Sequence, residues 1–434
     1  MRAAPRLLSR LGVVAGLGLL GLGLTACTTG ETAPAAETSG SASSPAPSAT
    51  GPSGASGSSS DDAWATWDAA LAAVDDEPAR WLAVGDSITE GQGASSLGTR
   101  WVDLTRDGLR AAHPVEGVAG GVGYRPAAFA TYGPDSPWAQ WATARDGRTT
   151  AVADVADLGR RAVELDPGSS LRYDTVGTDL DLWWTPGEGA FSYRVDAQAE
   201  VVVDTASGGS GGSDGSSGAD ASDGSDGSDA SDASGTVGVT EVTGLAAGPH
   251  VVTISVADDA PASVVLQGLA QFDGDRGRGV TLYDSARSGA TVSTFTDDLD
   301  GFLAAAGAAQ PDLVTITLGA NDAVTTSPDD LAAGYTTLIE GLRGLDSAPS
   351  VLVVDEFTPA LSVASAWNGS AADYRSAVEE VARQTGSAHV TIDDALAGSG
   401  VADLGSLLSA DGLHPNDAGQ RVLADYLTAT LARG

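Results

Sequence analysis

Short, largely apolar segments that alternate with helix-like segments constrain the fold most strongly. Residues 313–318 read Leu-Val-Thr-Ile-Thr-Leu, and residues 351–354 read Val-Leu-Val-Val. Strands that are apolar at consecutive positions are buried on both faces, as in parallel sheets covered by helices. The expected strands are 81–84, 280–283, 312–318, 351–354 and 388–392, and the expected helices are 97–112, 292–306, 328–345, 371–384 and 415–432. This alternation predicts an α/β protein with a three-layer α/β/α domain and a mainly parallel sheet.

A second periodicity interrupts this alternation over residues 149–275. Leu180, Leu182 and Trp184 occupy every second position, which is typical of strands with one buried face. Glycine and proline separate several such segments, as they do in antiparallel sheets. The pattern predicts an inserted antiparallel β-sandwich within a discontinuous α/β domain. The expected pieces of that domain are residues 61–148 and 276–434.

Two segments consist almost entirely of small and polar residues. Residues 27–60 are rich in Ser, Ala, Gly, Pro and Thr, and residues 207–235 are rich in Gly, Ser and Asp. Neither segment has enough apolar surface to bury a core. We expect a flexible tether at 27–60 and a disordered loop within the insert at 207–235. Aspartate recurs every third residue in that loop, a spacing that matches no calcium-binding loop.

The first 26 residues have the pattern of a signal peptide. Arginines at positions 2, 6 and 10 precede an apolar run at 11–24 that is too short for a comfortable membrane span. The run ends in Leu-Thr-Ala-Cys, which resembles a bacterial lipobox and implies cleavage before Cys27 and lipid on its thiol. Cys27 is the single cysteine of the chain. We therefore expect a lipoprotein on the outer face of a bacterial cell membrane, the alternative being an ordinary signal peptide with an incidental cysteine.

Composition argues against several functions. The formal net charge of −36 leaves the chain poorly suited to neutralising nucleic-acid phosphates. All 22 basic residues are arginine, so Schiff-base chemistry and a phosphate-loop lysine are excluded. The four histidines lie far apart and form no His-Glu-x-x-His motif, so we expect no metal and no cofactor. We expect a monomer whose acidic surface supports solubility.

Two short motifs supply the groups that nucleophilic ester chemistry needs. Ser87 follows the expected strand 81–84, at the carboxyl end where open α/β sheets place their sites. Asp411 and His414 lie three residues apart before the last expected helix. A serine hydroxyl, a histidine base and a carboxylate that orients the base form a catalytic triad. Ser87 alone would equally fit a helix N-cap, and His414 alone a surface residue; their joint presence favours catalysis.

Four segments in order resemble the SGNH, or GDSL-type, hydrolase family. They read Gly-Asp-Ser-Ile-Thr at 85–89, Ser-Gly-Ala-Thr at 288–291, Gly-Ala-Asn-Asp at 319–322 and Asp-Gly-Leu-His-Pro at 411–415. The resemblance spans the two α/β pieces and implies an ester hydrolase with the family's roles. Ser87 is then the nucleophile, His414 the general base and acid, and Asp411 its partner.

The same resemblance implies an oxyanion hole. Its donors are the N–H of Ser87, the N–H of Gly289 and the side chain of Asn321, with Asp86 and Asp322 as supporting residues. The family's second segment usually reads Asn-x-Gly-x-x-Gly, whereas this chain has Asp and Ala at positions 284 and 286. A competing glycine-rich stretch at 117–123 leaves the second donor open.

The insert resembles the β-sandwich modules found beside carbohydrate esterases. The first substrate to expect is therefore an acetylated polysaccharide or a short-chain ester. Trp183 and Trp184 are candidate sugar-stacking residues, although adjacent strand residues point to opposite faces and one of them fits a core position. Lipid esters, acyl transfer to a second sugar, and a glycan-binding protein with a vestigial site stay open as alternatives.

Overall fold

The computed structural model describes residues 62–132, 136, 142–206 and 237–433. The chain divides into two units, Met1–Ser56 and Gly57–Gly434, and every described residue belongs to the second. The predicted signal peptide, Cys27, the tether at 27–60 and the loop at 207–235 lie outside the described residues.

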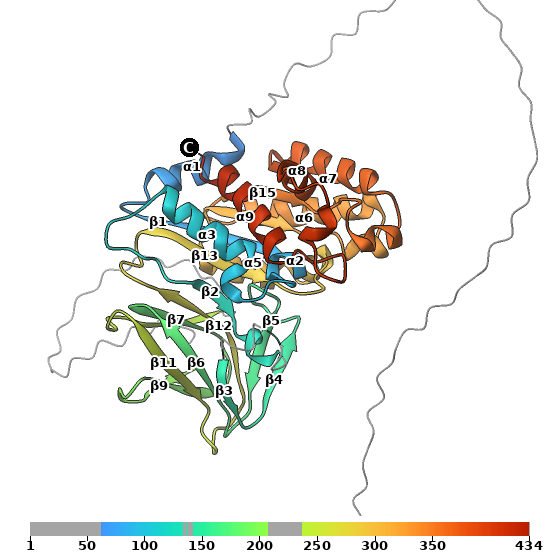
Figure 1. Ribbon diagram of the computed structural model, residues 1–434. Helices are drawn as coiled ribbons and strands as arrows, with labels where there is room; N and C mark the ends of the chain where they lie inside the picture. Colours follow the sequence, from blue (N-terminus) through green and yellow to red (C-terminus); the bar gives the residue numbers. More distant parts are fainter. Residues whose placement is uncertain (1–61, 133–135, 137–141, 207–236, 434) are drawn as a thin grey trace, which may run out of the picture. The chain divides into compact units, whose positions relative to one another are not determined.

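Six parallel strands form one side of an eleven-stranded sheet (Figure 1). In spatial order they are β2 (Gly123–Pro126), β13 (Gly279–Ala286), β1 (Pro78–Gly85), β14 (Leu313–Thr317), β15 (Ser350–Asp355) and β16 (Ala388–Thr391). Every residue of β14 and β15 is buried, so both faces of the sheet are covered. The predicted α/β fold with a mainly parallel sheet is confirmed.

The helices pack in two groups. One group contains α3 with α9, α8 with α9, and α1, whose Trp67 donates from Nε1 to the carbonyl oxygen of Leu431 in α9. The other contains α4, α5, α6 and α7. Their bounds are α1 Ala65–Ala72, α2 Ser87–Glu90, α3 Trp101–Ala112, α4 Val292–Thr296, α5 Leu299–Ala309, α6 Pro328–Arg343, α7 Ala371–Thr385, α8 Ile392–Gly398 and α9 Asp417–Leu431.

Two predicted helices differ from the observed ones at capping residues. The helix expected at 292–306 is split into α4 and α5, because Asp298 accepts a hydrogen bond from the Gly301 N–H and starts a new helix. The helix expected from 415 begins at Asp417, because the Asn416 side chain caps it through the N–H groups of Ala418 and Gly419.

The sheet continues beyond the parallel strands into antiparallel ones. β12 (Val264–Phe272) pairs antiparallel with β2 and carries β5 (Arg161–Leu165), β4 (Thr149–Ala153), β7 (Asp179–Thr185) and β10 (Gly238–Val242). A second, five-stranded antiparallel sheet has the order β3 (Ala142–Asp146), β6 (Ser170–Val176), β11 (Pro249–Ser255), β8 (Ala190–Val195) and β9 (Val201–Asp204). The strands that pair only antiparallel therefore begin at β3, before the predicted boundary at 149.

A hydrophobic core lies between the two antiparallel layers. Leu182 and Leu266 of the large sheet belong to one buried cluster with Tyr173 and Ile254 of the five-stranded sheet. The insert thus shares one sheet with the α/β part and supplies the other layer itself.

Neither tryptophan of the 183–184 pair is a surface residue. Trp184 is 1% exposed in the core between the antiparallel layers, and Trp183 is 2% exposed against Tyr124 and Tyr283. Adjacent strand residues point to opposite faces, and here both faces are covered. The prediction that these side chains stack on sugars is therefore wrong for this conformation.

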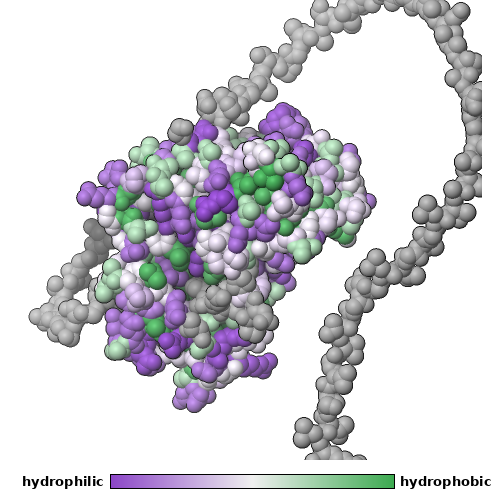
Figure 2. Space-filling view, viewed as in Figure 1, coloured by the Kyte–Doolittle hydropathy of each residue, from purple (hydrophilic) through white to green (hydrophobic). Residues whose placement is uncertain are grey.

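The visible surface is mostly polar. Figure 2 shows hydrophilic residues over most of one face, with apolar residues in small patches. Within the described ranges, no helix combines the length and apolarity needed to cross a membrane.

Candidate active site

Three neighbouring strands end side by side where the predicted motifs begin. Gly85 of β1 lies in register with Ala286 of β13 and with Thr317 of β14. Parallel strands end at a common edge, and the loops that follow them build the site there. The sheet register therefore brings Ser87, Gly289 and Asn321 to one edge of the sheet.

A tight turn places Ser87 at the start of α2. The Asp86 carboxylate accepts a hydrogen bond from the Ile88 N–H at 2.8 Å and caps this short helix. Gly85 is required at the turn, because a Cβ there would lie 2.1 Å from Thr89 Oγ1 and 3.0 Å from the Thr317 carbonyl oxygen.

Ser87, His414 and Asp411 form one hydrogen-bonded chain. His414 Nε2 lies 2.8 Å from Ser87 Oγ, across a separation of 327 residues in sequence. His414 Nδ1 lies 2.7 Å from Asp411 Oδ2. A carboxylate only accepts, so Nδ1 carries the proton and Nε2 is left as the acceptor for the Ser87 hydroxyl. The sequence predicted that these three residues would meet, and the structure brings them together.

The Asp411 carboxylate accepts backbone hydrogen bonds in addition to the one from the imidazole. Its Oδ1 accepts from the N–H groups of Leu413 at 2.9 Å and His414 at 3.1 Å. Partial burial raises the pKa of Asp411, but the bond from the His414 side chain and the two backbone bonds lower the pKa by more, and the net pKa lies below its ordinary value. The carboxylate therefore stays ionised opposite the imidazole.

Gly289 lies in a β-turn fastened to the end of β1. The Ala290 N–H donates to the Arg287 carbonyl oxygen at 2.9 Å, and the Arg287 N–H donates to the Gly85 carbonyl oxygen at 2.9 Å. Gly289 is the third residue of this turn and has φ 78°, a conformation that favours glycine. Its N–H pairs with no protein acceptor in the part of the chain that the structure describes.

The competing glycine-rich stretch at 117–123 lies at the other edge of the sheet. It precedes β2, which runs parallel to β13, so it meets the amino end of these strands. A Cβ at Gly121 would contact the Gln271 carbonyl oxygen, and one at Gly123 the Leu282 carbonyl oxygen. Position favours Gly289 over this stretch as a donor beside Ser87.

Asn321 links the two turns. Its Nδ2 donates to Asp86 Oδ2 at 2.8 Å and to the Ala290 carbonyl oxygen at 2.9 Å. The amide group therefore lies at the site, but these bonds use both of its hydrogens. To stabilise an oxyanion, Asn321 must share one of them.

Asp86 and Asp322 are buried carboxyls that hold the neighbouring loops. Asp322 accepts the Val292 N–H at 3.0 and 3.2 Å. Burial raises the pKa of Asp86 to about 7, and the negative charge of Asp322 adds to that shift. Burial raises the pKa of Asp322 to about 6. Within the described residues, no group of three or more His, Cys, Asp or Glu side chains could hold a metal ion.

Sequence analysis missed Glu90, which contacts the Gly289 turn. Its carboxylate accepts from the Ser288 N–H and lies 3.1 Å from Arg161 Nη1. The sequence feature that could have identified Glu90 is its position as an acidic residue three places after Ser87. Its partner Arg161 lies in the insert, and no local pattern links the two.

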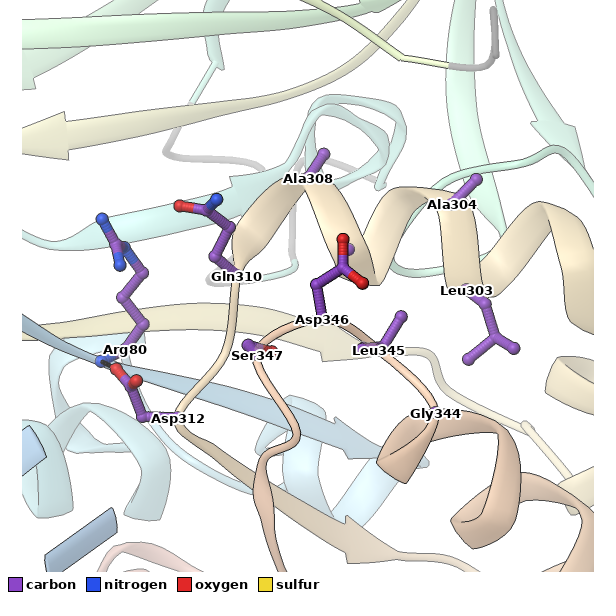
Figure 3. Close-up of a pocket in the computed structure, with 11 residues that line it drawn as sticks. Arg80, Leu303, Ala304, Ala308, Gln310, Asp312, Gly344, Leu345, Asp346 and Ser347 are labelled. Carbon is purple, nitrogen blue, oxygen red and sulfur yellow. Dashed lines mark hydrogen bonds between the residues drawn. The ribbon is translucent and has the colours of Figure 1, made fainter. Parts of the chain in front are cut away.

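Two cavities differ in their relation to the site. The larger, about 680 Å³, lies at the amino ends of β1 and β14. Its lining residues include Arg80 and Gln310 on one side and Leu303 on the other (Figure 3). The length of β1 separates it from Ser87. A smaller cavity of about 270 Å³ borders the Gly289 turn and is lined by Glu90, Gln92, Tyr132, Ser136 and Ser288.

Comparison with known proteins gives the family. The model of the GDSL-like lipase/acylhydrolase family matches residues 245–422, a range that contains Gly289, Asn321, Asp411 and His414. These residues therefore contain a GDSL-like lipase/acylhydrolase domain. The match leaves out the Ser87 turn, which precedes the insert and which the fold brings next to His414.

One solved structure supports the fold, and two weaker matches are reported beside it. The chain resembles a peptidoglycan O-acetylesterase with TM-score 0.59 and 15% identity, covering 84% of this chain and 94% of that one. A family two carbohydrate esterase from Clostridium thermocellum matches with TM-score 0.29 and 16% identity, over 65% of this chain and 98% of that one. A lipase/acylhydrolase from Enterococcus faecalis matches with TM-score 0.31 and 19% identity, over 36% and 77%. No curated protein matches the chain.

Proposed function

We propose that this acylhydrolase removes acetyl or other short acyl groups from a carbohydrate through a covalent acyl-serine. The hydrogen-bonded chain of Ser87, His414 and Asp411 carries the proposal. His414 Nε2 takes the proton of Ser87 as Oγ attacks the ester carbonyl carbon, and Asp411 stabilises the resulting imidazolium. The imidazolium then protonates the leaving sugar oxygen as the C–O bond breaks.

Water completes the cycle by the same route in reverse. His414 takes a proton from water, the hydroxide oxygen attacks the acyl carbon, and Ser87 leaves with the proton returned by the imidazolium. In both steps the carbonyl oxygen gains negative charge. We assign the N–H groups of Ser87 and Gly289 and the amide of Asn321 as the donors that receive it.

The small acyl group is inferred from the size of the site. The cavity beside the Gly289 turn measures about 270 Å³ and has mostly polar lining residues. A long acyl chain needs an extended apolar pocket, whereas an acetyl group does not. The peptidoglycan O-acetylesterase that shares the fold makes O-acetylated glycans the first substrates to test.

A substrate panel tests the proposal. Acetate release from O-acetylated peptidoglycan and acetylated xylan is compared with hydrolysis of aryl esters of increasing acyl length. We expect acetyl esters to give the highest kcat/KM, and the value to fall steadily with chain length. A preference for long acyl chains would instead make the protein a lipid esterase, and transfer of acetate to an added sugar would make it an acyltransferase.

Asn321→Ala should lower kcat by about 10²–10³-fold if the amide receives the oxyanion. The substitution also removes the bonds to Asp86 and Ala290, so melting temperature is measured alongside. Asn321→Asp is the second variant, because it keeps the size but replaces a donor with an acceptor. A kcat within about twofold of wild type in both variants would rule out Asn321 as a donor.

We further propose that the enzyme is a membrane-anchored lipoprotein outside the cytoplasm, modified at Cys27. The support is the signal-like sequence before Cys27 and its place as the single cysteine. Cys27→Ser should move the protein from the membrane fraction to the soluble fraction and abolish labelling by radioactive palmitate, whereas Thr28→Ser should change neither. Retention of the Cys27→Ser protein in the membrane would contradict the anchor.

A further inference from the structure

Glu90 joins three segments that are distant in sequence. It is the last residue of α2, and 3% of it is exposed. Its Oε2 accepts the Ser288 N–H, its Oε1 accepts the Tyr132 hydroxyl, and Arg161 Nη1 lies 3.1 Å away. The carboxylate therefore connects the Ser87 helix, the Gly289 turn and the antiparallel part of the fold.

The bond to Ser288 acts next to the oxyanion donor. The N–H of Gly289 belongs to the peptide plane that also contains the Ser288 carbonyl group. Glu90 fixes the N–H of Ser288 on one side of that plane, and the Arg287 carbonyl oxygen fixes the N–H of Ala290 on the other. Rotation of the plane, which would turn the Gly289 N–H away from Ser87, is restrained from both sides.

The antiparallel part of the fold holds Glu90 in turn. Arg161, at the start of β5, donates to the Tyr132 hydroxyl at 3.0 Å and to the Ala286 carbonyl oxygen at 2.8 Å, one residue before the turn begins. Its guanidinium also lies 5.1 Å from the centre of the Phe129 ring. Burial raises the pKa of Tyr132, so its hydroxyl keeps the proton that it donates to Glu90.

We propose that Glu90 is a positioning residue for the Gly289 turn. Tyr132 and Arg161 hold Glu90 in place, so the antiparallel part of the fold contributes to the geometry of the active site. The inference rests on the proposed serine mechanism. A buried carboxylate bonded to an arginine, a hydroxyl and an amide has little freedom to move, because each displacement leaves a buried polar group unpaired. That rigidity is what a preorganised oxyanion donor needs.

Glu90→Gln in the full chain tests the inference, because the amide keeps the size of the side chain but loses its charge. Active sites are counted with a fluorophosphonate probe, and kcat is expressed per labelled site. We expect kcat per site to fall about 10–100-fold with KM within about threefold. Affinity for an alkyl boronic acid, whose adduct with Ser87 places an oxygen among the oxyanion donors, should fall by a similar factor.

Two further variants keep the result interpretable. Glu380→Gln is the matched control, since Glu380 pairs with Arg383 on the exposed surface of α7, and it should change neither value. Tyr132→Phe removes one hydroxyl from the cluster and should lower kcat per site about three- to tenfold. If Glu90→Gln does not fold, the result for Tyr132→Phe alone tests the inference.

A purely structural role would lower the number of labelled sites or the melting temperature but leave kcat per site and boronic acid affinity unchanged. That outcome, in Glu90→Gln or in a folded Tyr132→Phe, would overturn the inference. It would leave the serine mechanism intact, because that mechanism is tested separately by Ser87→Ala and His414→Gln.

Discussion

Ser87→Ala is expected to reduce kcat for ester hydrolysis by about 10⁴-fold or more. In the proposed mechanism the hydroxyl oxygen is the nucleophile, and it lies 2.8 Å from His414 Nε2, the only base to which it is hydrogen-bonded among the described residues. Alanine leaves the proposed oxyanion donors and the cavity beside the Gly289 turn in place, so a small activity above the uncatalysed rate should persist. Rates are measured with an acetyl aryl ester, and melting temperature is measured on the same samples.

A matched control separates chemistry from folding. Ser192→Ala, in β8 of the five-stranded sheet, should keep wild-type activity because its Oγ makes one long hydrogen bond of 3.5 Å to the Ser255 carbonyl oxygen. Ser87→Ala should also lose all labelling by a fluorophosphonate. If a folded Ser87→Ala protein hydrolyses esters at the wild-type rate, the covalent mechanism is wrong.

The fold and the three central residues could be predicted because their signals are local. Every residue of the strand Leu313–Thr317 is buried, and its largely apolar sequence reflects that burial directly. Ser87, Asn321 and Gly289 each follow such a strand, and parallel strands must end at one edge. Placing these motifs after strands, together with the resemblance to the hydrolase family, was therefore enough to predict that they meet.

The relation of the insert to the parallel sheet could not be predicted. β12 pairs with β2 through Leu269 and Arg125, residues far apart in sequence whose alternation reveals only that each strand has a buried face. Alternation does not name the partner strand. For the same reason the sequence did not reveal that Trp183 is buried. This side chain packs on Tyr124 and Tyr283 of the parallel sheet.

The bonding of polar side chains was also beyond the sequence. Asn321 follows its strand as predicted, yet its amide already bonds Asp86 and Ala290. Glu90 and Arg161 meet only because the insert folds back against α2. Such contacts depend on the final positions of several loops and not on the spacing within any one of them.

His414→Gln should cause a loss of kcat as large as that of Ser87→Ala, about 10⁴-fold or more. Glutamine cannot take the Ser87 proton, so the hydroxyl remains a weak nucleophile. Groups that act as one unit are not additive, and the double variant Ser87→Ala/His414→Gln should be no slower than either single variant. Asp411→Asn should lower kcat less, by about 10²–10³-fold, because 46% of the Asp411 side chain is exposed and water can partly replace it in stabilising the imidazolium.

The four variant proteins are compared by kcat on one acetyl ester and by the rate of fluorophosphonate labelling. If His414→Gln kept more than about a tenth of wild-type activity, or if the double variant lost the product of the two single effects, Ser87 and His414 would not act as one unit.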